Sequence, residues 1–311
     1  MMTVIFQDKI IYMPYMPPFA RSEKMEDYTS VCKPVEWEHK HIKSLDGTKI
    51  ALCVGNIPNP LLEVTMTGRK KHVVICYFQG NGSALPPRLP LLSNTLKAIN
   101  AQNASPGGET TYTLVALSYR GYWTSSGRAS QRGIEQDAQA LLQWISGTFS
   151  APSSDLDLIL WGQSIGAGVA ATAAATYLKD KASPDPPVTG LVLETPFSGI
   201  KSMLIALYPQ KWLPYRYLWP FLWNHWDSIA ALRSIAAGSQ KPQVLILPAT
   251  RDEVVPPGEA DKLERVSREV GLPTLRKDII GALHTEATTR REGQDAVARF
   301  VSNVSNGKNL R

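Results

Sequence analysis

The 311-residue sequence is poor in cysteine and in long hydrophobic runs, and both absences narrow its class. Its three cysteines, Cys32, Cys53 and Cys76, are widely spaced and fit neither a disulfide framework nor a zinc-binding pattern. We therefore expect a reducing, cytoplasmic location. No run approaches the ~18 apolar residues that a membrane-spanning helix requires, and Asp8 and Lys9 interrupt the apolar N-terminus. The N-terminus also lacks the continuous apolar core of a signal peptide.

Charged residues make up only 19% of the chain, and the net charge of +6 comes from dispersed Lys and Arg. Proteins that bind nucleic acids concentrate their basic residues on one face or stripe. We therefore expect no nucleic-acid partner. Peripheral association of the protein with an anionic membrane surface stays open. The sequence does not indicate an oligomeric state.

Short apolar runs rich in branched residues alternate with segments of helical character. Such runs, without polar alternation, are typical of strands buried on both faces of a parallel sheet. The expected strands are 72–79, 112–119, 156–162, 190–194, 244–248 and 275–280, and the expected helices are 130–145, 258–270 and 285–301. Asp46-Gly47 indicates a hairpin turn, so the sheet should open with antiparallel strands. The alternation predicts one α/β domain with a doubly wound, mostly parallel sheet.

A G-x-S-x-G pattern, Gly162-Gln163-Ser164-Ile165-Gly166, lies between a predicted strand and a predicted alanine-rich helix. This is the context of a nucleophile elbow, where small neighbours permit a strained turn that projects the serine hydroxyl above the sheet. A glycine-rich connection that serves only close packing is the alternative interpretation. A dinucleotide-binding fingerprint has a different glycine spacing. The pattern therefore predicts Ser164 as a catalytic nucleophile.

A serine nucleophile needs a general base, which is itself oriented by an acid. In folds with this elbow the chain order is serine, acid, histidine. Of the five histidines, only His284 follows both the serine and the strand that should deliver the acid. Asp252 comes just after that strand, and we favour it as the acid over the adjacent Glu253. A turn-forming role for Asp252 and an ordinary surface position for His284 are the alternatives.

The tetrahedral intermediate of acyl transfer needs backbone N–H donors. One donor comes from the residue after the nucleophile, Ile165, and the other comes from the loop after the third strand. That loop reads Phe78-Gln79-Gly80-Asn81-Gly82-Ser83, and its two glycines allow the backbone to approach a ligand closely. We assign the second donor to Asn81, with a plain glycine-rich turn as the alternative.

Residues 198–235 break the strand–helix rhythm, because prolines interrupt a segment dense in aromatic residues. These aromatic residues are Tyr208, Trp212, Tyr215, Tyr217, Trp219, Phe221, Trp223 and Trp226. One interpretation is a lid over an acyl pocket, for which the predicted lining residues are Gln79, Tyr122, Trp123, Trp219 and Trp223. An interfacial membrane anchor and a simple cover for the sheet edge are the other two interpretations.

The sequence resembles the α/β-hydrolase superfamily, and within it the fungal bud-emergence (Bem) group and the animal α/β-hydrolase domain-containing proteins 13 and 17. The resemblance covers roughly residues 45–303. Its most specific stretch is Tyr119-Arg120-Gly121-Tyr122 with Ser125, Gly127, Ser130, Gly133 and Asp137, which is similar to the group's YRGYGxSxGxPSxxGxxxDA block. The group's elbow and its VPP after the catalytic aspartate match residues 162–166 and 255–257. The resemblance implies the triad Ser164, Asp252 and His284.

Two positions depart from the group's pattern. The usual H-G-N-A-G at the oxyanion loop is Gln79-Gly80-Asn81-Gly82 here, and we expect the Gln79 side chain to hold the loop by hydrogen bonding. The glycine after YRGY is Trp123, which should place a bulky ring near the mouth of the site. Many relatives also begin with a membrane-anchor helix that this sequence does not show.

The predicted organisation is an N-terminal extension over residues 1–40 and an α/β-hydrolase domain over 41–305, with a cap at 198–235. The predicted activity is hydrolysis of an ester or thioester through an acyl-enzyme, as in a carboxylesterase, a lipase-like enzyme or an acyl-protein thioesterase. The substrate would be a small-molecule or lipidated acyl compound, with no cofactor or metal. Two alternatives stay open: a serine peptidase of the prolyl-aminopeptidase type and a non-catalytic protein of polarity or trafficking. The peptidase would need acidic residues that segment 198–226 lacks.

Overall fold

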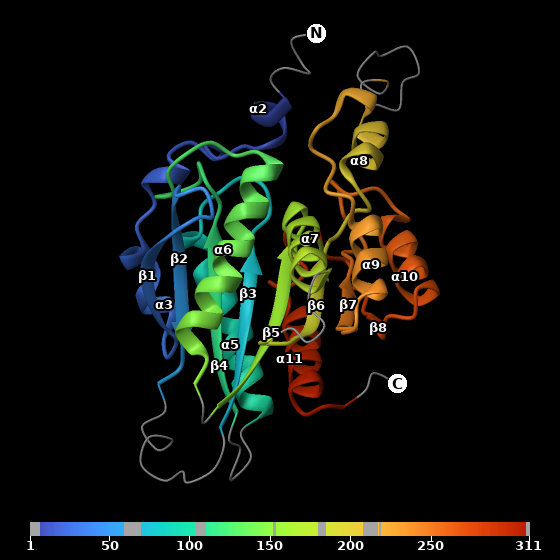
Figure 1. Cartoon of the computed structure of the whole chain (residues 1–311). Helices are drawn as coiled ribbons and strands as arrows, with labels where there is room; N and C mark the ends of the chain where they lie inside the picture. Colours follow the sequence, from blue (N-terminus) through green and yellow to red (C-terminus); the bar gives the residue numbers. More distant parts are fainter. Residues whose placement is uncertain are drawn as a thin grey trace.

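The computed structural model describes residues 7–58, 70–103, 110–151, 154–179, 185–207, 217 and 219–308. In these ranges eight strands form one sheet in the order β1-β2-β4-β3-β5-β6-β7-β8 (Figure 1). They are β1 (Glu36–Lys43), β2 (Lys49–Asn56), β3 (Lys70–Phe78), β4 (Thr110–Ser118), β5 (Ser154–Gln163), β6 (Val188–Glu194), β7 (Gln243–Leu247) and β8 (Thr274–Arg276). Strand β2 is antiparallel to β1 and β4, and all other pairs are parallel. The prediction of a mostly parallel sheet with an antiparallel opening is confirmed.

Helices cover both faces of this sheet. The α-helices are α2 (Gln7–Ile11), α3 (Thr29–Cys32), α5 (Leu89–Gln102), α6 (Gln131–Phe149), α7 (Ile165–Lys179), α8 (Ile200–Leu207), α9 (Ser228–Ala237), α10 (Glu259–Glu269) and α11 (Arg291–Ser305). Short 3₁₀ turns are η1 (Ala20–Ser22), η2 (Met25–Tyr28), η3 (Pro86–Arg88) and η5 (Trp219–Phe221). Helices α6, α7, α9 and α10 lie on one face, and α3, α5 and α11 lie on the other (Figure 1). The doubly wound arrangement is therefore as predicted.

The end of the chain differs in detail from the sequence-based expectation. Strand β8 stops at Arg276. Beyond it the chain stays beside β7 through the Lys277 N–H, which donates to the Ile246 carbonyl at 2.9 Å, and through an isolated bridge between Ile279 and Ala249. The last helix begins at Arg291 rather than near 285. The Thr288 hydroxyl and backbone N–H both donate to the buried Glu194 carboxylate, which holds this segment in turns against the sheet. These tertiary contacts delay the start of the helix.

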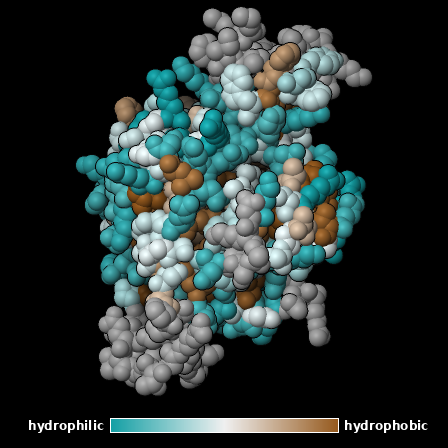
Figure 2. All heavy atoms as spheres, viewed as in Figure 1, coloured by the Kyte–Doolittle hydropathy of each residue, from teal (hydrophilic) through white to brown (hydrophobic). Residues whose placement is uncertain are grey.

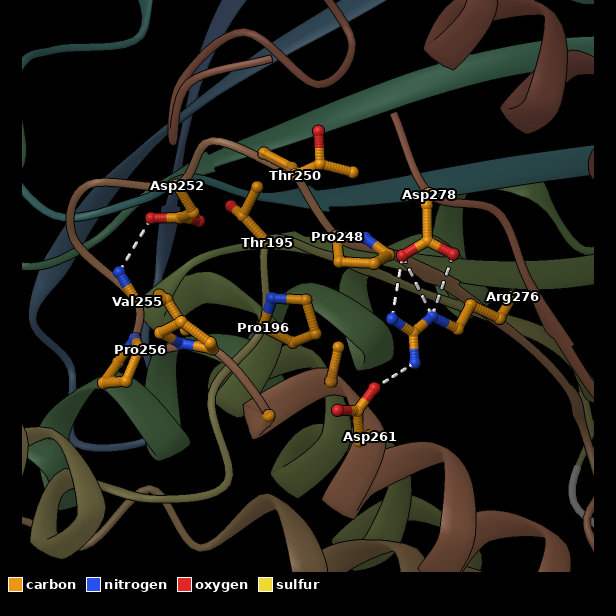
Figure 3. Close-up of a pocket in the computed structure, with 14 residues that line it drawn as sticks. Thr195, Pro196, Pro248, Thr250, Asp252, Val255, Pro256, Asp261, Arg276 and Asp278 are labelled. Atoms are coloured by element: carbon orange, nitrogen blue, oxygen red, sulfur yellow. Dashed lines mark hydrogen bonds and ion pairs between the residues drawn. The ribbon is translucent and has the colours of Figure 1, made fainter. Parts of the chain in front are cut away.

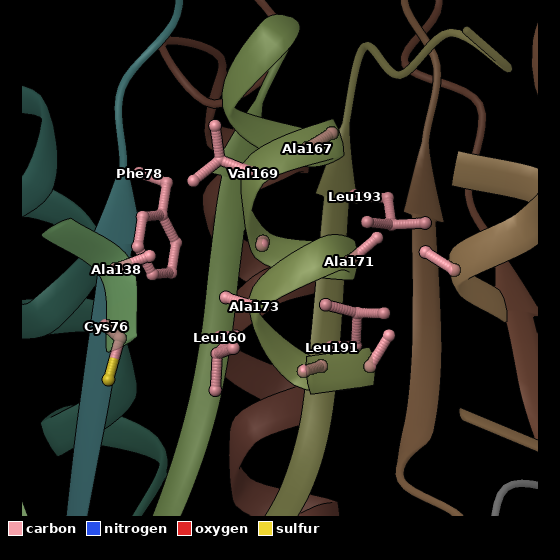
Figure 4. Packing of buried hydrophobic residues seen from close by; sticks show 14 of the residues in the cluster. Cys76, Phe78, Ala138, Leu160, Ala167, Val169, Ala171, Ala173, Leu191 and Leu193 are labelled. Carbon is pink, nitrogen blue, oxygen red and sulfur yellow. The ribbon is translucent and has the colours of Figure 1, made fainter. Parts of the chain in front are cut away.

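The alanine-rich helix α7 packs closely onto the centre of the sheet (Figure 4). Ala167 and Ala171 face the strand residues Leu191 and Leu193 of β6, while Phe78 of β3 lies beside the same helix. Small side chains let the helix axis approach the strands, and the cluster of buried residues spans the whole helical face. This packing fixes the N-terminal end of α7 above the carboxyl end of β5.

The predicted N-terminal extension is packed onto the sheet domain. Strand β1 begins at Glu36, inside the range assigned to the extension, and Tyr12, Cys32 and Val35 are buried. All three cysteines are free and buried. Among the helices that the structure describes, none is long and apolar enough to cross a bilayer.

Candidate active site

Ser164 occupies a strained turn between β5 and α7, as the elbow pattern predicts. Its φ angle is 54°, in the left-handed region that side chains other than glycine rarely adopt. A Cβ atom on Gly162 would lie 2.0 Å from the Gly166 carbonyl oxygen, and one on Gly166 would lie 2.1 Å from the Phe78 carbonyl oxygen. Only glycine therefore fits on either side of the serine. The Ser164 side chain itself is half-buried.

Asp252 and His284 lie in the loops that follow β7 and β8, and their side chains meet. The His284 Nδ1 atom is 2.8 Å from one Asp252 carboxylate oxygen and 3.0 Å from the other. The backbone N–H groups of Val254 and Val255 donate to the same carboxylate at 2.9 and 2.7 Å. Glu253 contacts the backbone instead, since its carboxylate accepts the His284 N–H at 2.9 Å. Asp252 therefore orients the imidazole ring, and Glu253 anchors the residue that carries it.

The Asp252 carboxylate is held in its charged form. Burial by itself would raise the pKa of Asp252, but the hydrogen bond from His284 and the one from the Val255 N–H outweigh it, so this pKa is lowered. Asp252 also lines a cavity of about 280 Å³ together with Thr195, Pro248 and Val255 (Figure 3). Ser164 is not among the lining residues, so this cavity lies behind the acid rather than at the nucleophile.

The serine and the histidine lie at the same carboxyl edge of the sheet without a closed contact. Strand β6 separates β5, which precedes Ser164, from β7, and the backbone N–H of Ser164 donates to the Glu194 carbonyl at 2.8 Å. Within the described ranges, no hydrogen bond joins the Ser164 hydroxyl to the His284 ring. Catalytic hydrogen bonds in unliganded enzymes are often long and tighten in the substrate complex.

The backbone donors that we predicted lie on two neighbouring segments. Ile165 is the first residue of α7, so its N–H has no partner in the helix ladder. The loop of Asn81 follows β3, the strand that pairs with β5. A Cβ on Gly80 would lie 3.1 Å from the Gln163 side-chain oxygen, which brings this loop against the residue just before the nucleophile.

The expectation that the Gln79 side chain holds the oxyanion loop is wrong. Gln79 is buried, and neither its amide nitrogen nor its amide oxygen has a hydrogen-bond partner. The loop is held instead by the Tyr119 hydroxyl, which donates to the Gln79 carbonyl at 2.8 Å, and by the Asn81 side chain. Tyr122 donates to Asn81 Oδ1 at 2.8 Å and is 1% exposed, so it supports the loop from within the core.

Trp123 also has a different setting from the predicted mouth position. Its side chain is only 3% exposed, because the ring lies 4.4 Å from the His39 ring, centroid to centroid. The indole N–H donates to the Glu23 carbonyl at 2.8 Å. Trp123 thus packs the N-terminal segment onto the sheet domain and presents almost no surface to a substrate.

The aromatic insertion is described in part, and its described rings fall into two groups. Trp226 is fully buried, whereas Trp219 and Trp223 are 41% and 51% exposed. Trp219 lines a cavity of about 410 Å³, and the Lys201 ammonium lies 3.5 Å from its ring centroid. The Trp223 indole N–H donates to Asp8 at 3.3 Å. The predicted rings Tyr208, Trp212 and Tyr215 lie outside the described residues.

Glu194, at the carboxyl end of β6, is a buried acid near the site that the sequence analysis did not single out. One carboxylate oxygen accepts from Trp161 Nε1 at 2.9 Å, and the other accepts from the Thr288 hydroxyl at 2.6 Å. Burial raises the pKa of Glu194, although these hydrogen bonds oppose the shift. The sequence signal that could have identified Glu194 is an acidic residue at the end of an otherwise apolar strand. Glu194 fixes the segment that follows His284.

The described residues contain no group of three or more His, Cys, Asp or Glu side chains that could hold a metal ion. The groups at this edge of the sheet are those that nucleophilic acyl transfer requires: a hydroxyl on a strained turn, a carboxylate–imidazole pair, and backbone N–H groups at the start of α7 and in the loop after β3.

Comparison of the sequence with known proteins gives several relatives, although no family model matches. The chain is 28% identical to alpha/beta hydrolase domain-containing protein WAV2 of Arabidopsis thaliana, over 82% of this chain and 73% of that protein. It is 27% identical to protein bem46 of Schizosaccharomyces pombe, over 81% of this chain and 72% of that protein. Lysophosphatidylserine lipase ABHD12 of Danio rerio is 32% identical over 60% of this chain, which spans only 45% of that lipase.

Comparison with solved structures gives the same fold. An alpha-beta hydrolase from Vibrio vulnificus superposes with a TM-score of 0.68 and 17% identity, over 96% of this chain and 93% of that one. An esterase from Pyrobaculum calidifontis gives a TM-score of 0.63 and 14% identity, over 97% and 96%. At these identities the likeness is one of fold.

Proposed function

Because the chain has the α/β-hydrolase fold and is homologous to α/β-hydrolase domain-containing proteins, we propose that it is a serine hydrolase that cleaves an ester or thioester bond. The observation that carries the proposal is the Asp252–His284 pair, 2.8 Å apart, at the same sheet edge as Ser164 on its strained turn. A packing turn alone would need neither a strained serine nor a carboxylate aimed at a histidine.

In the proposed reaction the Ser164 hydroxyl attacks the carbonyl carbon of the substrate, and His284 Nε2 takes the hydroxyl proton. Asp252 keeps the other imidazole nitrogen protonated and stabilises the imidazolium that forms. The Ile165 and Asn81 N–H groups hold the oxyanion of the tetrahedral intermediate. His284 then gives its proton to the departing alcohol or thiol. A water molecule repeats the attack on the acyl-enzyme, which releases the acid and restores the serine.

We propose a substrate with an acyl chain. Described residues of the insertion carry exposed rings at Trp219, Phe221 and Trp223, and segment 198–226 contains no Asp or Glu to bind the amino group of a peptide. A relative named as a lysophosphatidylserine lipase supports the same substrate class. In Figure 2 a few hydrophobic atoms show in the α8 region near the top of the view, beside paler and hydrophilic ones.

A fluorophosphonate probe tests the nucleophile, since it phosphonylates activated serines. The probe should label the wild-type chain and Ser126→Ala, whose side chain is exposed on a neighbouring loop, and should not label Ser164→Ala. Ester hydrolysis should be lost in the same variant, with its circular dichroism spectrum unchanged. Undiminished labelling of Ser164→Ala would show that the nucleophile is elsewhere.

A panel of esters tests the substrate class. Each buried methylene contributes about 0.8 kcal/mol, so two extra carbons in the acyl chain should raise kcat/KM on the order of tenfold until the pocket is filled. Hydrolysis that does not depend on chain length contradicts an acyl pocket, whatever the outcome of the labelling.

A further inference from the structure

Residues 7–16 cross the carboxyl edge of the sheet and contact both the oxyanion loop and the aromatic insertion. In Figure 1, α2 lies above the sheet, on the side where the strands preceding the site residues end. We call residues 7–16 the clamp. Three polar residues of its contacts, Gln7, Tyr12 and Asn224, are buried, and the hydrogen bonds to Asn81 are partly exposed.

One end of the clamp holds the Asn81 side chain by both halves of its amide. Asn81 Oδ1 accepts from the Met13 N–H at 3.0 Å, from its neighbour Gly82 N–H at 2.9 Å and from the Tyr122 hydroxyl at 2.8 Å. The Asn81 Nδ2 group donates to the Ile11 carbonyl. An amide with this many partners has one orientation, and the backbone N–H proposed for the oxyanion belongs to the same residue.

The clamp also touches the next two residues of the loop. The Ser83 N–H donates to the Met16 carbonyl. Gly82 has a φ of 72°, and a Cβ on it would lie 3.3 Å from the same carbonyl oxygen. The conformation of residues 82 and 83 is therefore stabilised by contact with the clamp, and the two backbones pack closely against each other.

The other end of the clamp is fixed to the insertion through Tyr12 and Gln7. The Tyr12 hydroxyl is buried, donates to Asn224 Oδ1 at 2.9 Å and accepts from Trp226 Nε1 at 2.9 Å. Gln7 Oε1 accepts from the Trp223 N–H at 3.0 Å and from Asn224 Nδ2 at 3.2 Å. Losing one partner from such a buried set leaves unsatisfied polar groups, so the set resists displacement.

Trp226 carries this connection to the helix that begins at the nucleophile. A Cβ on Gly168 of α7 would lie 3.0 Å from the Trp226 Cβ, so the two backbones are close. Ile165 is the first residue of the same helix. The clamp thus joins the two segments that carry the proposed oxyanion donors, Asn81 on one side and Ile165 on the other.

We propose that the clamp positions the oxyanion hole and that Tyr12 is its positioning residue, an inference that rests on the proposed serine hydrolysis. Oxyanion contacts form only in the transition state, so loosening them lowers kcat and leaves KM unchanged. Losing a donor outright costs about 10²–10³ in kcat, and we expect displacement of one to cost about tenfold.

The test compares Tyr12→Phe with Tyr15→Phe in the full chain. Both changes remove one hydroxyl from the same segment, but Tyr15 is 68% exposed and its hydroxyl has no hydrogen bond within the described ranges. Tyr12→Phe should lower kcat about tenfold at constant KM, and Tyr15→Phe should not. Affinity for a trifluoromethyl ketone, which forms a tetrahedral adduct with the serine, should fall by the same factor as kcat. Tyr122→Phe, which removes a donor to Asn81 from the opposite side, should show the same split.

The outcomes separate the two proposals. If the wild-type chain is active and Tyr12→Phe has the same kcat as Tyr15→Phe, the proposed role of the clamp is overturned and the proposed hydrolase activity is not. The same holds if the only effect of Tyr12→Phe is a lower melting temperature. A wild-type chain that neither reacts with fluorophosphonate nor hydrolyses esters overturns the proposed function, and the clamp's part in catalysis with it. Hydrogen exchange of the loop amides 80–83 should be faster in Tyr12→Phe than in Tyr15→Phe, and equal rates contradict the mechanical link.

Discussion

The His284 ring is hydrogen-bonded to the side chain of Asp252 and not to that of Glu253, although the two acids are adjacent in the sequence. The imidazole Nδ1 lies 2.8 Å from Asp252, while the Glu253 carboxylate accepts the backbone N–H of the histidine. Asp252 therefore acts on the imidazole ring, and Glu253 holds the backbone of the same histidine. Mutations can separate the two effects.

We expect Asp252→Asn to lower kcat by roughly 10⁴, the size of effect seen when the orienting acid of a serine protease is made neutral. Glu253→Gln is the matched control, since it also neutralises a carboxylate that touches His284, and we expect a loss of less than about tenfold. Steady-state kinetics on a short-chain ester measures both. A larger loss in Glu253→Gln would mean that the acid has been misassigned.

The elbow glycines give a prediction about stability. Gly166→Ala places a Cβ 2.1 Å from the Phe78 carbonyl oxygen, and we expect a loss of at least about 3 kcal/mol in the free energy of unfolding because backbone must move. Gly147→Ala in α6 is the control, since a Cβ there meets nothing within 4 Å and should add about 1 kcal/mol through helix propensity. Urea denaturation measures both, and equal effects would contradict the close packing of the elbow.

A half-buried histidine distant from the site, His72, predicts how stability depends on pH. Burial lowers the pKa of His72, which pairs with the Thr113 hydroxyl, to about 4. Between about pH 6.5 and 4 the unfolded chain binds a proton that the folded chain does not, so stability is complete above this window and falls within it. Between pH 7 and 4.5 the free energy of unfolding should decrease less for His72→Gln than for the wild type. The difference between the two decreases should be on the order of 1–2 kcal/mol. Burial also lowers the pKa of His39 and His41, so a smaller slope should persist.

Urea denaturation at the two pH values tests this, with the exposed His225 changed to Gln as the control. His225→Gln should follow the wild-type slope. A variant His72→Gln with an unchanged slope would assign the acid sensitivity to other groups.

The exposed rings of the insertion predict a contact with lipid. Trp223 is 51% exposed, and we expect Trp223→Ala to weaken binding to vesicles of phosphatidylcholine and phosphatidylserine severalfold, with a stability loss below about 1 kcal/mol. Trp226 is fully buried and hydrogen-bonded to Tyr12. Trp226→Ala should therefore lower the free energy of unfolding by about 3–5 kcal/mol. Vesicle flotation and thermal unfolding separate the two effects. Unchanged flotation of Trp223→Ala would remove the lipid contact from the account of this region.

The sequence by itself determined the sheet and the elbow. Apolar runs such as 156–162 identified buried strands, and Asp46-Gly47 placed the antiparallel hairpin, whose strands pair with Lys43 opposite Lys49. The G-x-S-x-G pattern placed Ser164 because the sterics of the elbow act over five consecutive residues. Chain order pointed to His284 and Asp252. The strands, the hairpin and the elbow are local signals carried by periodicity or spacing, whereas the acid and the histidine follow from their order along the chain.

Only the tertiary structure decided which polar groups meet across the fold. Nothing near Gln79 in the sequence indicates that its amide is buried without partners while Asn81 is bonded to residues about 70 positions earlier. Likewise, the exposure of Trp223 and the burial of Trp226 depend on which distant segments pack against each ring, not on their similar sequence surroundings. Hydrogen bonds between distant segments depend on the packing of the whole chain, and no short sequence pattern encodes them.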